Sequence, residues 1–240
     1  MNELAGKVAL VTGAAGALGG AVVAALAQAG ATLALTDHHD EKLRRVYPRD
    51  YPDGPWRRAC DLADGAAVAT LVDDAVAAHG HLDLLINCHG VYRGGTPLHE
   101  TPLAEWDALM DANARSVFHT CRAAVPHLLR AAAAGGSGRI VNVGARAALA
   151  GSAGSALYIA SKSAVVRLTE SLAAELRERG VGVNCVLPGT IDTPANRAAR
   201  PGADASRWVS PAAIADVILF LCSTAARAVH GAAIPVYGLS

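Results

Sequence analysis

The sequence predicts a single-domain α/β fold with a doubly wound parallel sheet of seven strands and helices on both faces. Short runs rich in Val, Leu and Ile alternate with longer segments of helical periodicity along the whole chain. These runs are apolar throughout, as expected of strands that helices cover on both sides. The chain has 240 residues, of which 52% are hydrophobic, and no linker divides it. We therefore expect one domain, residues 1–240, with a large buried core.

The order of the elements follows from the alternating runs. Strands are expected at residues 7–13, 32–37, 82–87, 139–144, 181–189 and 232–238, with a brief strand ending at Asp61. Helices are expected at residues 17–29, 64–80, 103–133, 156–179 and 211–223, with a short charged helix after the second strand. Two segments depart from the pattern. Residues 46–55 are rich in Tyr and Pro and should be irregular, and the polar segment 193–209 should form a substrate loop or lid.

Composition and charge exclude several classes of partner. The 21 basic residues balance the 21 acidic ones, so we expect no attraction to nucleic acid or to an anionic membrane. No uncharged apolar stretch is long enough to span a membrane, and the first residues do not resemble a secretory signal. The five cysteines are scattered without a CxxC pair and should be reduced. Together these features predict a cytoplasmic protein.

A glycine-rich turn, TGAAGALG at residues 12–19, joins the first predicted strand to the first helix. Such a turn lets backbone N–H groups and a helix N-terminus approach a pyrophosphate. Asp37 ends the second predicted strand, where a carboxylate accepts hydrogen bonds from a ribose 2′-hydroxyl and repels a 2′-phosphate. The turn contains no Arg or Lys, and His38 follows Asp37. This pattern favours NAD(H) over NADP(H), although Asp37 could instead be a solvated acid at a strand end.

Tyr158 and Lys162 are four residues apart, so on a helix they share one face. A tyrosine phenol ordinarily loses its proton at about pH 10. An ammonium beside it favours the phenolate, which would bring the pKa of Tyr158 toward the range useful for proton transfer. Taken alone, the pair could equally be two surface residues of an amphipathic helix.

The glycine turn, Asp37 and the Tyr158/Lys162 pair, in this order on an alternating α/β chain, resemble the short-chain dehydrogenase/reductase family over nearly the full length. The resemblance implies a Rossmann fold, NAD as cofactor, a small-molecule substrate, and a homotetramer or homodimer formed through the helices at 103–133 and 156–179. It implies that Tyr158 is the general acid/base and that Lys162 lowers its pKa and holds the nicotinamide ribose. Asn113 would hold a water molecule for the proton relay. The cofactor-binding residues implied are Gly13, Gly16, Leu18, Gly19, Asp37, Asp61, Leu62, Asn87, Gly90, Tyr158, Lys162, Pro188, Gly189, Ile191 and Thr193.

The chain departs from the family pattern at the position of the catalytic serine, thirteen residues before the tyrosine, where it has Ala145. In the family this serine hydrogen-bonds the substrate oxygen, and losing such a donor typically costs a few kcal/mol of transition-state stabilisation. Either another group supplies the bond, or the substrate does not need it. Segments 144–165 and 187–208 are similar to dihydropteridine reductase, a branch that also has alanine here and reduces a quinonoid C=N system. This similarity favours a conjugated, electron-poor substrate.

Other side chains near the expected site have two interpretations each. His89 stands where the family has alanine, and it either donates a hydrogen bond in place of the serine or packs against the cofactor. Ser152 and Ser155 either reach the site or serve a loop or helix cap. In the segment 193–209, three arginines and a tryptophan either bind substrate or serve the loop: Arg197, Arg200, Arg207 and Trp208. His79 and His81 have no matching acidic or Cys partner, so we expect no metal site.

The leading prediction is therefore an NAD(H)-dependent oxidoreductase that transfers a hydride to or from a carbonyl or a conjugated imine or quinonoid substrate. Two alternatives remain. Ala145 could mark an NAD(H)-binding protein that has lost catalysis, although Tyr158, Lys162 and Asn113 are all retained. The same pocket could also perform a non-redox step, such as dehydration, with the tyrosine as acid/base.

Overall fold

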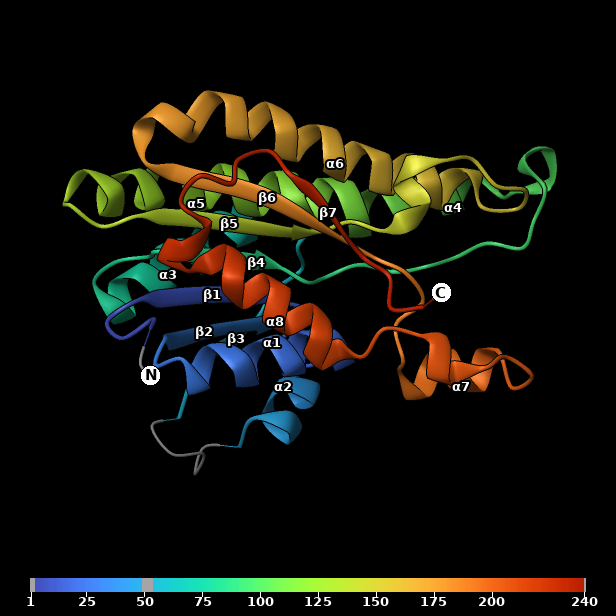
Figure 1. The fold of residues 1–240 in the computed structure, drawn as a ribbon, viewed down its shortest axis with the longest axis horizontal. Helices are drawn as coiled ribbons and strands as arrows, with labels where there is room; N and C mark the ends of the chain where they lie inside the picture. The colour runs from blue at the N-terminus through green and yellow to red at the C-terminus, as the bar shows by residue number, and fades with distance from the viewer. Residues whose placement is uncertain (1–2, 49–53, 240) are drawn as a thin grey trace.

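One parallel sheet of seven strands organises the computed structural model, which describes residues 3–48 and 54–239 (Figure 1). The strand order is β3-β2-β1-β4-β5-β6-β7, and every neighbouring pair is parallel. The chain therefore winds outward from β1 in one direction and then in the other, which confirms the predicted doubly wound fold. The strands are β1 (Val8–Thr12), β2 (Thr32–Asp37), β3 (Trp56–Ala59), β4 (Leu84–Asn87), β5 (Gly138–Val143), β6 (Val181–Pro188) and β7 (Ala233–Val236).

Helices cover both faces of the sheet. On one face, α1 (Ala17–Gln28) packs against α8 (Pro211–Cys222), and on the other α3 (Gly65–His79) packs against α5 (Ser116–Ala133) beside α6 (Ala156–Leu176). Side chains alternate between the two layers along each strand, so that Ile140 joins one core cluster and Val141 the other. Both faces are buried, which explains why the strands are apolar throughout.

The helix predicted at residues 103–133 is present, but it contains a π-helical turn. It consists of α4 (Leu103–Leu109), a π-helical turn (Met110–Arg115) and α5. A π turn inserts an extra residue into the helical ladder and changes the direction in which side chains project, and such turns are frequent at functional sites. Here the turn buries Asn113 completely. Helical periodicity alone does not reveal such a local insertion.

The segment 193–209 is more ordered than its polar, Pro-broken sequence indicated. It contains the short helix α7 (Pro194–Ala199) and a 3₁₀ turn (Ala205–Arg207). A parallel bridge between Ile191 and Val209 closes its base. In the Tyr- and Pro-rich stretch 46–55, α2 (Asp40–Val46) ends at its first residue, and the residues 49–53 lie outside those described.

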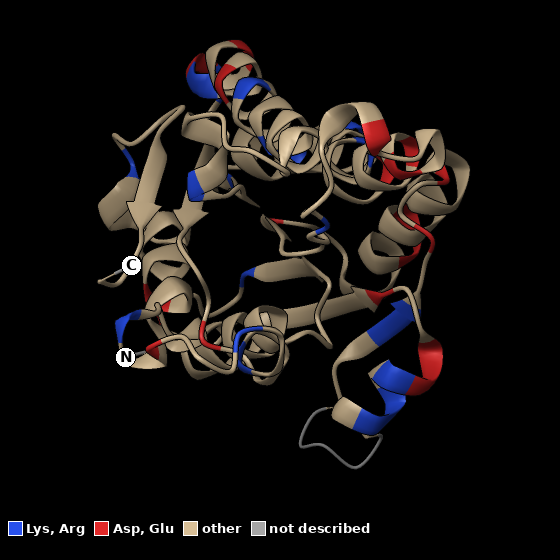
Figure 2. Ribbon diagram, turned by 90° about the vertical axis from the view of Figure 1, so that its right-hand side faces the viewer, with Lys and Arg blue, Asp and Glu red and all other residues tan. Residues whose placement is uncertain are grey.

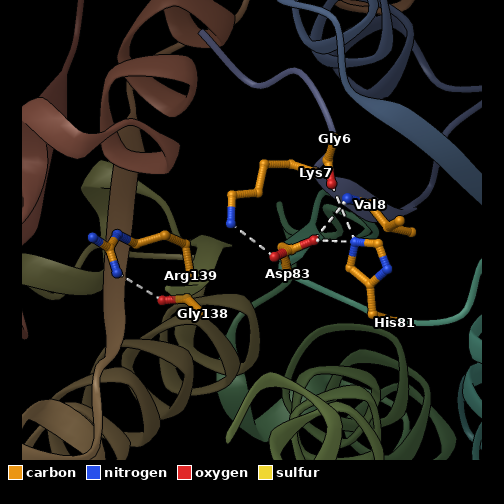
Figure 3. Close-up of polar contacts among 7 residues, drawn as sticks. All are labelled: Gly6, Lys7, Val8, His81, Asp83, Gly138 and Arg139. Carbon is orange, nitrogen blue, oxygen red and sulfur yellow. Dashed lines mark hydrogen bonds and ion pairs between the residues drawn. The ribbon is translucent and has the colours of Figure 1, made fainter. Parts of the chain in front are cut away.

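A buried carboxylate ties together the amino ends of two central strands (Figure 3). Asp83, directly before β4, accepts hydrogen bonds from the Val8 backbone N–H and the Lys7 Nζ, each at 2.9 Å. His81 Nε2 lies 3.0 Å from Asp83 Oδ2 and 3.1 Å from the Gly6 carbonyl oxygen. These contacts hold the amino ends of β1 and β4 in register. They thereby fix the relative position of the loops at the carboxyl ends of the two strands.

Those carboxyl ends all meet at one edge of the sheet, as parallel pairing requires (Figure 1). The helix α7 projects beyond this edge, as does the segment that leads from β4 to α4. Figure 2 looks onto this edge and shows short basic and acidic segments interspersed around it. All five cysteine side chains are free thiols. Within residues 3–48 and 54–239, no helix is long and apolar enough to cross a membrane.

Candidate active site

A cleft of about 470 Å³ opens where the strand order reverses between β1 and β4. The cleft also reaches the ends of β2 and β3 and the π turn. The predicted cofactor residues that line it are Gly13, Gly16, Asp37, Asp61, Leu62 and Gly90. Its volume and its position at the topological switch point are typical of small-molecule sites in open α/β sheets.

The floor of the cleft is a tight backbone turn after β1. Gly13 has a φ of 61°, and a Cβ there would lie 2.9 Å from the backbone nitrogen of His89. A Cβ on Gly19 would overlap the Gly13 carbonyl oxygen, so α1 could not approach β1 as closely with any other residue. The N-cap of α1 is Gly16, which has no side chain to cap the helix. The first N–H groups of α1 therefore remain available to an anion, while Leu18 is buried in the core.

Asp37 ends β2 and lines the cleft with its buried carboxylate. Its Oδ2 accepts a hydrogen bond from the Ala15 N–H at 3.1 Å, and its Oδ1 accepts one from the His38 N–H at 2.9 Å. The sequence analysis missed one neighbour: Lys42, in the first turns of α2, places its Nζ 3.9 Å from Asp37 Oδ2 and also lines the cleft. The charged residues at the start of α2 are evident in the sequence, but the orientation of this helix relative to Asp37 is not.

Asp61 and Asn87, two further residues predicted to bind the cofactor, have different surroundings. Asp61 Oδ1 accepts a hydrogen bond from the Ala63 N–H at 2.9 Å, which shapes the loop after β3. Asn87 is buried beneath the cleft, where its Nδ2 donates to Asn142 Oδ1 and its Oδ1 accepts from Thr120 Oγ1, both at 2.9 Å. The Asn87 side chain thus links β4 to β5 and α5, and it supports the cleft from below.

The cleft ends where Lys162 and Asn113 converge on Gly90. A Cβ on Gly90 would lie 2.9 Å from both Lys162 Nζ and Asn113 Oδ1. Lys162 is 5% exposed and donates a hydrogen bond to the Val143 carbonyl at 3.0 Å. Burial lowers the pKa of Lys162 from 10.5 to about 8, because the ammonium loses its hydration.

Asn113 is held by three hydrogen bonds in the π turn. Its Oδ1 accepts from the Val91 N–H at 2.9 Å, and its Nδ2 donates to the Val91 carbonyl at 3.0 Å. The second Nδ2 hydrogen goes to Ser161 Oγ at 2.9 Å, and Ser161 in turn donates to the Tyr158 carbonyl at 2.8 Å. Asn113 therefore fixes both the segment after β4 and the α6 turn that carries Tyr158.

The pKa of Tyr158 is raised in this structure, in contrast to the lowering expected from its spacing to Lys162. Burial of the phenol, followed by the nearby phenol of Tyr92, raises the pKa of Tyr158 to about 12. Both causes oppose ionisation of the phenol, and the Lys162 Nζ donates to the Val143 carbonyl. The Tyr158 phenol is therefore protonated at neutral pH. Tyr92 was not identified from the sequence; its ring packs edge-on against Tyr158 with centroids 4.9 Å apart.

The serine position is filled by Ala145, which is buried directly after β5 and Gly144. Ser155 occupies the N-cap position of α6, but its side chain makes no capping hydrogen bond. His89 lines the cleft, and burial of its imidazole lowers its pKa. Its backbone N–H donates to Thr12 Oγ1 at 3.2 Å.

The predicted residues after β6 lie at the base of the segment 193–209. The Gly189 N–H donates to the Val236 carbonyl at 3.2 Å, next to Pro188 at the end of β6. Ile191 pairs with Val209, and Thr193 Oγ1 caps α7 by accepting from the Asn196 N–H at 3.1 Å. In this structure the Thr193 hydroxyl therefore has a structural partner of its own.

All three arginines of this segment have protein partners. Arg197 forms a two-pronged pair with Asp192 at 2.6 and 2.8 Å. Arg207 donates to the Leu239 carbonyl at 2.7 Å, and Arg200 lies 3.4 Å from Thr190 Oγ1. These contacts favour the interpretation that the arginines stabilise the loop. Among the residues that the structure describes, no group of three or more His, Cys, Asp or Glu side chains is arranged to hold a metal ion.

Comparisons with known proteins agree with this geometry. The family model described as short chain dehydrogenase matches residues 7–204. The D-threitol dehydrogenase of Mycolicibacterium smegmatis is 35% identical over 247 residues, which cover 98% of this chain and 93% of that protein. The 3-oxoacyl-[acyl-carrier-protein] reductase FabG of Thermotoga maritima is 32% identical, covering 98% of each chain. The crystal structure of carveol dehydrogenase from Mycobacterium avium in complex with NAD has a TM-score of 0.88 at 28% identity, covering 99% of this chain and 98% of that one.

The buried Lys162 ammonium should make the protein less stable at neutral pH than at alkaline pH. The cost to the folded state is complete below about pH 8 and disappears above 10.5, where unfolded Lys162 also loses its proton. Lys162→Met should therefore raise the free energy of unfolding at pH 7 by up to about 3 kcal/mol. Urea unfolding at pH 7 and pH 10 measures this gain, which should shrink at the higher pH.

The matched control is Lys42→Met, because the Lys42 side chain is 39% exposed. This substitution should change the free energy of unfolding by less than about 1 kcal/mol at either pH. A pH-independent effect of Lys162→Met would contradict the assignment of a destabilising buried charge.

Proposed function

The chain belongs to the short-chain dehydrogenase family, and we propose that it is an NAD(H)-dependent oxidoreductase acting on a carbonyl or conjugated imine or quinonoid group of a small molecule. One observation carries the proposal: Lys162 Nζ and Asn113 Oδ1 meet at Gly90, and Gly90 lines the same cleft as Asp37. Tyr158 stands one turn before Lys162 on α6, so we infer that a proton donor and a carboxylate suited to an adenosine ribose serve this one cleft. The relatives named above are dehydrogenases and a reductase, which supports this class of reaction.

The residues present fit a dinucleotide. The uncapped N-terminus of α1 and the glycine turn suit the pyrophosphate, and Asp37 suits a ribose diol. Asp61 and Leu62 line the cleft between these points, where an adenine would lie. Lys162 would hold the second ribose through its Nζ beside Gly90. Bound NAD(H) would supply or accept the hydride. We place the substrate on the far side of Tyr158, under the segment 193–209 and the residues Pro188, Gly189, Ile191 and Thr193 at its base.

In the reducing direction, the chain's task is to deliver a proton to the substrate oxygen or nitrogen. Because the pKa of Tyr158 is raised to about 12, its Oη carries a proton at neutral pH and serves as the general acid. The Lys162 ammonium, whose pKa is about 8, is largely charged at pH 7 and stabilises the phenolate that remains. In the oxidising direction Tyr158 must first lose this proton, so that direction should accelerate as the pH rises.

Asn113 would orient this relay without itself exchanging a proton. Both Nδ2 hydrogens are donated, one to the Val91 carbonyl and one to Ser161 Oγ, and Oδ1 accepts one bond from the Val91 N–H. Only the second lone pair of Oδ1 is therefore available to a water molecule. That lone pair lies beside the Lys162 Nζ at Gly90. A water molecule bound there could connect the ammonium to solvent.

Two alternatives are an NAD(H)-binding protein without turnover, which the absence of the serine suggests, and an enzyme that performs a non-redox step such as dehydration. The alternatives differ in a simple measurement, the oxidation of NADH in the presence of ketones, quinones and imines. Turnover of any of these probes that depends on Tyr158 would exclude a lapsed enzyme. Tight NADH binding with no turnover across the panel would favour it, and loss of water from a hydroxylated probe without NADH oxidation would favour dehydration.

The role of Tyr158 predicts a selective loss of turnover. Tyr158→Phe should lower kcat by roughly 10²–10⁴-fold, because the general acid is lost while the ring still fills its place. The dissociation constant for NADH, measured by fluorescence titration, should change little. Lys162→Ala should impair both quantities, because we assign Lys162 a cofactor contact as well as stabilisation of the phenolate. Undiminished turnover by Tyr158→Phe would show that the proton comes from another group, with His89 the first candidate.

The position of Asp37 predicts tighter binding of NADH than of NADPH, because a carboxylate repels the 2′-phosphate. Asp37→Ala should narrow the difference between the two dissociation constants. Lys42→Met should instead widen it, because the Lys42 ammonium beside Asp37 is the cation that a 2′-phosphate would meet. Calorimetric titration of the three proteins with both cofactors measures these effects. Equal affinity of the unaltered protein for NADPH would show that Asp37 does not face the ribose 2′ position.

Self-association through the long helices is part of the proposal. Four large apolar side chains on α4, α5 and α6 are exposed: Leu103, Trp106, Phe118 and Leu168. Exposed apolar side chains on neighbouring helices are typical of protein–protein contacts. We therefore expect a homodimer or homotetramer by light scattering, and Phe118→Glu should weaken it. A monomer at micromolar concentration would contradict this assignment.

A further inference from the structure

We propose that the Tyr92 hydroxyl supplies the hydrogen bond to the substrate oxygen that Ala145 cannot supply. The site would then hold this oxygen between two phenols, Tyr158 as the proton donor and Tyr92 as the second hydrogen-bond donor. This inference rests on the proposed function, because it concerns the same substrate group and the same reaction.

The position of Tyr92 is fixed by the residues that form the relay. Tyr92 follows Val91, whose N–H and carbonyl are both hydrogen-bonded to the Asn113 side chain at 2.9 and 3.0 Å. Three residues later, the Gly95 N–H donates to the Gly154 carbonyl at 2.7 Å, which ties the segment after β4 to the loop that precedes α6. Tyr92 therefore lies on a segment anchored on both sides, between the loop that follows Ala145 and the helix that carries Tyr158.

The two phenol rings are in direct contact. Their centroids lie 4.9 Å apart at an interplanar angle of 81°, which is the edge-to-face arrangement that aromatic pairs favour. The charge of an ionised Tyr92 is felt at Tyr158, where it contributes to the raised pKa. Tyr92 is 57% exposed, so its side chain is accessible from solvent and does not fill the core.

The Tyr92 hydroxyl is available for a substrate. Within the described residues it has no hydrogen-bond partner in the protein, and it lies near Gly94, where a Cβ would approach Tyr92 Oη to 2.8 Å. Two serine hydroxyls of α6 are already used, because Ser161 donates to the Tyr158 carbonyl and Ser163 donates to the Ala148 carbonyl. The Ser155 hydroxyl lies beside the same position, where a Cβ on Gly94 would approach Ser155 Oγ to 3.1 Å. Tyr92 differs from Ser155 because its ring is in direct contact with the ring of Tyr158.

The chemistry needs only a hydrogen bond from Tyr92. On reduction of a carbonyl, the carbon receives the hydride of NADH and the oxygen receives the proton of Tyr158, so the C=O bond becomes a C–O–H group. Tyr92 keeps its proton throughout and stabilises the charge that develops on the oxygen before protonation is complete. A phenol is a stronger hydrogen-bond donor than the hydroxyl of serine, because it is more acidic. One such donor is worth roughly 10²–10³-fold in rate.

A hydroxyl exchange between two positions tests the inference. The unaltered protein, Tyr92→Phe, Ala145→Ser and the double variant are compared by kcat/KM for cyclohexanone and for 9,10-phenanthrenequinone, an unactivated and an activated carbonyl probe. Tyr92→Phe should lower kcat/KM for cyclohexanone by roughly 10²–10³-fold and leave the NADH dissociation constant unchanged. Adding Ala145→Ser to Tyr92→Phe should restore most of this loss, whereas Ala145→Ser alone should give a much smaller gain. Such non-additivity is the signature of two groups that fill one role.

Several outcomes would overturn the inference. Tyr92→Phe with the kcat/KM of the unaltered protein for both probes would exclude it, as would an equal gain from Ala145→Ser in the presence and absence of the Tyr92 hydroxyl. A loss that Tyr92→Leu shows but Tyr92→Phe does not would assign Tyr92 a packing role. Tyr158→Phe separates the two proposals: if it remains active, the proposed function fails, and if it is inactive while Tyr92→Phe is fully active, only the role of Tyr92 fails. A gain from Ala145→Ser confined to cyclohexanone would indicate that the natural substrate needs no second donor.

A measurement without substrate or cofactor tests the same geometry. With 3-fluorotyrosine at all five tyrosine positions, the phenols become more acidic and each can be titrated by fluorine NMR. Tyr158→Phe and Tyr92→Phe identify the two resonances. In Tyr92→Phe, the pKa of residue 158 should fall, because the neighbouring negative charge is absent. An unchanged titration of residue 158 would show that the two hydroxyls do not face a common space and would overturn the inference.

Discussion

A line of close contacts at three glycines across the carboxyl edge of the sheet determines how the site is assembled. Gly19 of α1 packs on the Gly13 carbonyl, Gly13 packs on the backbone of His89, and the next residue, Gly90, meets the Asn113 and Lys162 side chains. At Gly19 and Gly13 the neighbouring atoms belong to the backbone, so backbone atoms set how closely α1, β1 and the segment after β4 approach one another. At Gly90 the missing side chain leaves room for Asn113 Oδ1 and Lys162 Nζ. The cofactor half and the proton-donating half of the cleft are thereby held in a fixed relation.

This constraint explains which features could be predicted from the sequence. The strands were predictable because burial on both faces makes them continuously apolar. Asp37 and Asp61, at or just after strand ends, were predictable as site residues because parallel strands bring their carboxyl ends to one edge of the sheet. Features that depend on contacts between distant segments were not. The π turn around Asn113 breaks no sequence rule, and Lys42 reaches Asp37 only because α2 begins in a particular direction. Tyr92 is another such feature, because only the folded chain brings its ring against the ring of Tyr158.

The electrostatics of the site show why the spacing of Tyr158 and Lys162 was an incomplete guide. The sequence indicated an attraction between an ammonium and a phenolate, which would favour the charged form of both groups. Burial favours the neutral form of both groups. Burial raises the pKa of Tyr158 to about 12 and lowers that of Lys162 to about 8, so each group is pushed toward its neutral form. Lys162 is 5% exposed and its Nζ donates to the Val143 carbonyl beside Gly90, so the ammonium has lost most of its hydration. Such opposed shifts are typical of sites where protons move.

The same crowding bears on the missing serine. Ala145 lies directly after Gly144, where a Cβ would lie within 2.9 Å of the Leu187 and Cys185 side chains, so a hydroxyl-bearing side chain at position 144 would be crowded. We therefore expect a replacement hydrogen-bond donor from another segment, one whose position is fixed relative to Tyr158. The segment after β4 meets this condition, because Asn113 holds Val91 by both of its backbone groups and thereby couples Tyr92 to Tyr158 through Ser161. A hydroxyl from the segment after β4 would approach the substrate from a different direction than a hydroxyl from the end of β5. The shapes of substrate that can place an oxygen against Tyr158 would change accordingly.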